Sequence, residues 1–169
     1  NANFWQEVGA FYTDHGIDAW NDLVPNEVTN NPDFSARCAQ GVMQYFLDCR
    51  SNGYTGDFII IEPGGGIGKF CYLFLKQLQY LMEVSCFNAS SMTYWLCDQS
   101  KQTQAFWREQ PQLKPFIDQE MLSIERLCLT NEDGEFRIES SFDTLSLKNK
   151  RVVVLSNYFL EQTFQVKIG

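Results

Sequence analysis

Short apolar runs alternate with segments of helical periodicity along this chain. Residues 58–61 form a continuous apolar run, β-branched in three of its four positions, and residues 93–97 and 151–155 contain two more. Such runs without polar alternation are typical of parallel strands that are buried on both faces. We therefore predict three buried strands there. Residues 121–129 are a further, less regular strand candidate because Glu125 and Arg126 interrupt the apolar pattern, and residues 136–138 are a candidate for a short edge strand.

Four segments between and before these runs have the spacing of amphipathic helices. Aromatic and aliphatic side chains recur at three and four from Phe4 to Tyr12, and Asn31-Pro32 is a typical cap and first turn for a helix that ends near residues 51–53. A third helix begins at Lys69. A fourth covers residues 100–110 and stops at Pro111.

The alternation of strands and helices predicts an α/β fold. We expect a Rossmann-like, doubly wound parallel sheet preceded by N-terminal helices. Residues 1–55 would be the helical segment, with an aromatic face that belongs either to the core or to a cap over a ligand. Residues 56–169 would be the first half of the ligand-binding domain. Because Asn1 is not an initiator Met, we also expect the chain to be part of a longer protein.

The net charge and the cysteine content restrict the binding partners and the cellular compartment that we expect for this chain. The net charge of −8, from 13 basic and 21 acidic residues, disfavours binding to a nucleic-acid backbone. No run of about 18 apolar residues and no secretion signal occurs, so we expect no membrane contact and a cytoplasmic location. The six cysteines contain no C-x-x-C pair and His15 is the one histidine, which disfavours a metal site and suits a reducing compartment. His15 itself fits a surface position better than a catalytic base.

The segment Glu62-Pro63-Gly64-Gly65-Gly66-Ile67-Gly68 follows the first predicted strand directly. Glycines at this position let the backbone turn tightly and approach a ligand, although a tight turn without a ligand would also need them. A phosphate-binding P-loop is excluded because Pro63 and Phe70 occupy its first and last positions. A dinucleotide-binding fingerprint is disfavoured because Lys69 stands where its third glycine belongs.

The remaining pattern, Glu62-x-Gly64-x-Gly66-x-Gly68, resembles the first motif of class I S-adenosylmethionine-dependent methyltransferases. Asp98 ends the second strand, where that family places the acid that binds the ribose. Ser156-Asn157-Tyr158-Phe159 is similar to the N-[EY]-F-F-D segment of a subgroup that includes complex I assembly-type arginine methyltransferases. Leu160-Glu161 departs from that segment. The family's sheet has further strands, so we expect more chain after Gly169.

The resemblance implies S-adenosylmethionine as cofactor and a role for each site residue. The residues assigned to the cofactor are Glu62, Gly64, Gly65, Gly66, Gly68, Asp98, Gln99 and Asn157. Methyl transfer would be an in-line displacement that needs alignment and exclusion of water. Asn157 and Tyr158 would face the unidentified acceptor, a protein side chain or a small molecule, and Glu161 could take a proton from it.

Other interpretations compete with these assignments. Asp98 could serve only the start of the following helix, and Asn157 and Tyr158 could be packing residues. The alternative function is a catalytically inactive, methyltransferase-like interaction domain. A nicotinamide-dependent oxidoreductase ranks third because of Lys69.

Overall fold

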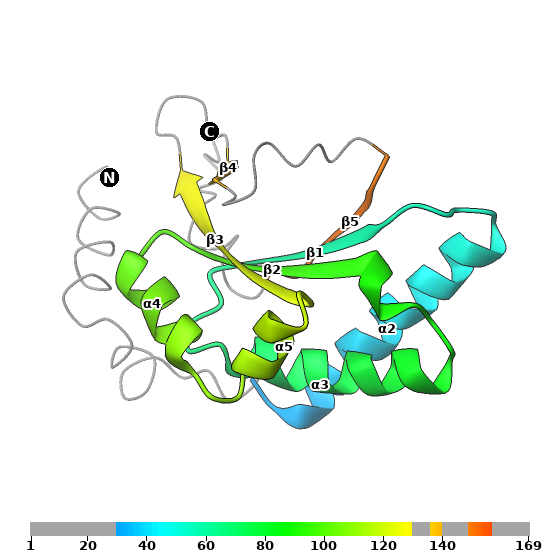
Figure 1. The fold of residues 1–169 in the computed structure, drawn as a ribbon, viewed down its shortest axis with the longest axis horizontal. Helices are drawn as coiled ribbons and strands as arrows, with labels where there is room; N and C mark the ends of the chain where they lie inside the picture. Colours follow the sequence, from blue (N-terminus) through cyan, green and yellow to red (C-terminus); the bar gives the residue numbers. More distant parts are fainter. Residues whose placement is uncertain (1–29, 130–135, 140–148, 157–169) are drawn as a thin grey trace, which may run out of the picture.

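The computed structural model describes residues 30–129, 136–139 and 149–156 of the chain (Figure 1). Expectations for the first helix, for His15 and for Asn157, Tyr158 and Glu161 lie outside these residues. The described elements, in chain order, are α2 (Pro32–Ser51), β1 (Phe58–Pro63), α3 (Lys69–Val84), the 3₁₀ turn η2 (Ala89–Ser91), β2 (Met92–Asp98), α4 (Lys101–Glu109), α5 (Lys114–Asp118), β3 (Leu122–Leu129), β4 (Phe136–Glu139) and β5 (Arg151–Val154).

The strands form one sheet in the order β4-β3-β2-β1-β5. The strands β3, β2, β1 and β5 run parallel to one another, and β4 pairs antiparallel with β3. If only the four parallel strands are counted along the chain, β5 is the fourth and their order in the sheet is 3-2-1-4. This is the arrangement of a Rossmann-like α/β fold. The predicted Rossmann-like α/β fold class is therefore confirmed, as are all five predicted strands within the described residues.

Side chains from alternate positions of the strands enter two separate hydrophobic clusters. Phe58 and Ile60 of β1 belong to the larger cluster, which they share with residues of α2, α3, α4 and α5. The labelled helices all lie on this side of the sheet (Figure 1). The second cluster contains strand residues from the other face, namely Ile59, Ile61, Trp95, Cys97 and Leu127.

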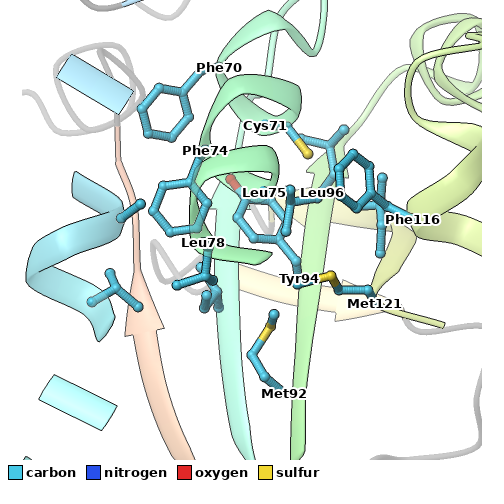
Figure 2. Close-up of a cluster of buried hydrophobic side chains, with 14 of the residues drawn as sticks. Phe70, Cys71, Phe74, Leu75, Leu78, Met92, Tyr94, Leu96, Phe116 and Met121 are labelled. Atoms are coloured by element: carbon cyan, nitrogen blue, oxygen red, sulfur yellow. The ribbon is translucent and has the colours of Figure 1, made fainter. Parts of the chain in front are cut away.

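The helix α3 supplies more buried residues to the core on the helix-covered face than any other described helix. Its buried residues point toward Tyr94 and Leu96 of β2, and Phe116 of α5 closes one side of the cluster (Figure 2). The helix α2 packs against α3 and contributes four buried residues to the same core, Ala39, Val42, Met43 and Phe46. Asn31 caps α2 as predicted, because its Oδ1 accepts the N–H of Phe34 at 2.9 Å. None of the described helices is long and apolar enough to cross a membrane.

The structure corrects the prediction that residues 151–155 are buried on both faces. Val153 packs against the larger core, but Val152 and Val154 are 37% and 58% exposed. Among the described strands, β5 pairs with β1 alone and is thus an edge of the sheet. A β-branched run favours a strand, but how much of it is buried depends on the elements that cover it. The short helix α5 was not predicted.

Candidate functional site

The carboxyl ends of β1 and β2 lie side by side because the two strands are parallel neighbours. In their register Pro63 is opposite Cys97, so Gly64 and Asp98 follow at the same level of the sheet. The N–H of Gly64 donates to the carbonyl oxygen of Cys97 at 2.8 Å and joins the two strand ends. The structure therefore brings together the two sequence segments that were predicted to form the site.

The residues 64–68, here called the glycine loop, turn the chain from β1 into α3. Gly64, Gly66 and Gly68 have φ values of 70°, 53° and 77°, in the left-handed region that favours glycine. The N–H of Gly68 donates to the carbonyl oxygen of Gly65 at 2.8 Å. The helix α3 then begins without a side-chain cap.

Close packing also disfavours a side chain at two of these glycines. A Cβ on Gly65 would overlap Cδ1 of Leu96, and a Cβ on Gly68 would lie 3.2 Å from Cδ1 of Trp107. Packing at Gly65 and the left-handed φ of Gly68 therefore favour glycine at these positions, whether or not a ligand lies over the turn.

Trp107 of α4 contacts the glycine loop, a relationship that the sequence analysis missed. Its indole Nε1–H donates to the carbonyl oxygen of Gly66 at 2.9 Å, and its side chain is fully buried. The helical periodicity of residues 100–110 predicted α4 correctly. Nothing in that pattern shows that a tryptophan on the helix bonds to a backbone atom 41 positions earlier.

Glu62 has its carboxyl in the core of the helix-covered face. The residue is 3% exposed, and its Oε2 accepts a hydrogen bond from the Tyr94 hydroxyl at 2.6 Å. Burial raises the pKa of Glu62 to about 7, although the Tyr94 bond acts in the opposite direction. A carboxyl in this position would act on a ligand over the glycine loop through its charge rather than by contact.

Asp98 shapes the turn that follows β2. Its Oδ1 accepts the N–H of Ser100 at 2.7 Å, and partial burial raises the pKa of its carboxyl while hydrogen bonds from the backbone of Ser100 and Gln99 lower it. The cap of α4 is Ser100, whose Oγ accepts the N–H of Thr103 at 3.3 Å. The side chain of Gln104 donates to the carbonyl oxygen of Asp98 at 2.9 Å. Gln99 is exposed beside this turn.

A surface hollow of about 660 Å³ lies elsewhere on the sheet. Its lining includes Asp57 and Lys150, which come just before β1 and β5 and whose charged groups are 3.7 Å apart. None of the predicted site residues lines it. In an open parallel sheet ligands bind at the carboxyl ends of the strands, so the glycine loop remains the candidate site. Within the described residues, no cluster of His, Cys, Asp or Glu could hold a metal ion.

Comparisons with known proteins identify no relative. No protein-family model, no curated protein and no solved structure matches this chain.

Proposed function

We propose that this chain is a methyltransferase that binds S-adenosylmethionine at the carboxyl ends of β1 and β2. The observation that carries the proposal is the left-handed glycine turn in the segment Glu62-x-Gly64-x-Gly66-x-Gly68, joined directly to the strand end that carries Asp98. This is where an open parallel sheet binds ligands.

The proposed cofactor site combines close backbone approach with negative charge. Gly64, Gly65, Gly66 and Gly68 would hold the aminoacyl and ribose end, and Asp98 with Gln99 would accept hydrogen bonds from the ribose hydroxyls. The carboxyls of Glu62 and Asp98 favour a cationic sulfonium ligand over an anionic pyrophosphate. At neutral pH the charge of Glu62 is partial, because its pKa is raised to about 7.

The methyl group of the cofactor is already electrophilic, so the protein must align it with an acceptor and exclude water. Orientation alone can supply an effective molarity on the order of 10⁵ M. We assign the acceptor side to Asn157 and Tyr158, with Asn157 also near the cofactor, and a proton-accepting role to Glu161 for an amine or guanidine acceptor. Full turnover by a Glu161→Gln variant would remove that last assignment.

The cysteines support a cytoplasmic location for this enzyme. Five of them, Cys38, Cys49, Cys71, Cys86 and Cys97, are free thiols. Free thiols are typical of a reducing compartment.

A catalytically inactive, methyltransferase-like interaction domain is the second candidate. The packing of Gly65 against Leu96 and of Gly68 against Trp107 favours it, because these contacts alone would preserve the glycine loop in a chain that had lost its ligand.

Calorimetric titration of S-adenosylhomocysteine into the chain tests the proposal. We expect micromolar binding that weakens at least tenfold in Asp98→Ala, a change of about 1.4 kcal/mol. Asp118→Ala is the matched control, since Asp118 is an exposed acid on α5. NAD should not bind. Absence of S-adenosylhomocysteine binding to the unmodified chain would contradict the cofactor assignment and favour the interaction domain.

A further inference from the structure

We infer that Trp107 is a positioning residue, which together with Gln104 lets α4 hold the glycine loop and the Asp98 turn at a fixed separation. The ligand for which they are held is that of the proposed function. The contacts that fix this separation lie within the chain itself, so their effect on the glycine loop can be measured without any ligand.

The Trp107 indole contacts the glycine loop at several points. Its Nε1–H donates to the carbonyl oxygen of Gly66, a residue in the left-handed region. Its ring also lies 3.2–3.3 Å from the positions that a Cβ would take on Gly65 and Gly68. A buried indole N–H without an acceptor destabilises the folded state. This hydrogen bond therefore favours one orientation of the Gly66 peptide.

Gln104 lies three positions before Trp107 and on the same face of α4. It is 6% exposed, and its Nε2 donates to the carbonyl oxygen of Asp98 at 2.9 Å. One face of α4 therefore contacts the segment after β1 through Trp107 and the end of β2 through Gln104. These contacts add to the bond between the Gly64 N–H and the Cys97 carbonyl oxygen at the base of the same site.

A ligand that spans two loops binds more tightly when the loops are already at the required separation, because less ordering is needed on binding. The α4 contacts supply this order before any ligand arrives. Loss of the Trp107 hydrogen bond should therefore loosen the glycine loop more than the rest of the fold and weaken ligand binding.

Amide hydrogen exchange of Trp107→Phe, measured by NMR, tests the inference. The substitution keeps an aromatic ring and removes the N–H donor. The reporters are the amides of Gly64 and Gly68, which donate to Cys97 and Gly65, and the reference is the Tyr94 amide, which donates to the carbonyl oxygen of Met121 in the core. We expect the substitution to accelerate exchange at the reporter amides by a factor at least ten times larger than at the reference amide. Trp95→Phe, which changes a buried tryptophan of the other sheet face, should not produce this local pattern.

Two further measurements separate positioning from general stability. S-adenosylhomocysteine should bind Trp107→Phe at least tenfold more weakly than it binds Trp95→Phe. Gln104→Leu, which removes the second donor at similar size, should likewise speed exchange in the glycine loop.

The outcomes distinguish this inference from the proposed function. Equal acceleration at the reporter and reference amides, or unchanged exchange in the glycine loop, would overturn the inference. If the unmodified chain does not bind S-adenosylhomocysteine but Trp107→Phe still loosens the glycine loop selectively, the positioning role stands and the proposed function fails.

Discussion

The Tyr94 hydroxyl donates a 2.6 Å hydrogen bond to Oε2 of Glu62 between two neighbouring parallel strands. Both side chains are buried. Burial and then the Glu62 charge raise the pKa of the Cys71 thiol on α3. Burial, followed by the charges of Glu125 and Glu62, raises the pKa of the Cys97 thiol on β2. The larger effect on Glu62 is its own burial, which raises its pKa from 4.5 to about 7. A carboxyl at the entrance to the glycine loop thus titrates near neutral pH.

Replacement of Glu62 should change how stability depends on pH. The folded-state pKa lies above the unfolded value of 4.5, so the folded state binds the proton more tightly. The contribution of the Glu62 proton to stability is fully present below pH 4.5 and is lost as pH rises through about 7. The loss is on the order of 3 kcal/mol. Urea unfolding of Glu62→Gln at pH 5 and pH 8 should show a smaller decrease between the two than the unmodified chain shows. Equal decreases would contradict the raised pKa.

Replacement of Tyr94 by Phe should cost more stability at pH 8 than at pH 5. At the higher pH Glu62 is mostly ionised, and the buried carboxylate would lose its hydrogen-bond donor at a cost of about 1–3 kcal/mol. At pH 5 the carboxyl is protonated and the loss is smaller. Urea unfolding at both pH values measures the difference. Tyr80→Phe is the matched control because Tyr80 is 57% exposed, and a similar pH-dependent cost there would argue against the pair.

Alanine at Gly65 should destabilise the fold by about 1–3 kcal/mol, because its Cβ would overlap Leu96 in the core. Gly41→Ala should have the opposite sign. Gly41 lies in α2 with nothing within 4 Å of its Cβ position, and alanine favours a helix by about 1 kcal/mol over glycine. Thermal unfolding of both variants measures the two effects. If Gly65→Ala were as stable as the unmodified chain, the glycine loop would not be packed as described.

Alanine substitutions along β5 should show which face of this strand contributes to the core. Val153→Ala should cost about 1 kcal/mol or more, since Val153 packs against the larger cluster. Val154→Ala should cost less than about 0.5 kcal/mol because Val154 is 58% exposed. Urea unfolding of the two variants gives the comparison. Equal costs would mean that both faces of β5 are buried, as the sequence pattern predicted.

The helix α4 illustrates how far local patterns reach. Its start at Ser100 and its stop before Pro111 were predictable, because a capping side chain and a proline act within a few residues. The five-residue α5 was missed because one and a half turns leave too little periodicity to detect. The bond from Trp107 to Gly66 depends on how α4 packs against the β1 end, which no local pattern contains.

The sequence by itself determined the order of the described strands and of the helices α2, α3 and α4, the parallel character of β1 and β2, and the glycine turn between β1 and α3. These features follow from apolar periodicity and from the backbone freedom of glycine, both of which act between residues close in the chain. Only the tertiary structure decided that Glu62 pairs with Tyr94, 32 positions later, and that Val152 and Val154 are exposed. Burial and hydrogen-bond partners depend on which segments become neighbours in space, and those neighbours are distant in sequence.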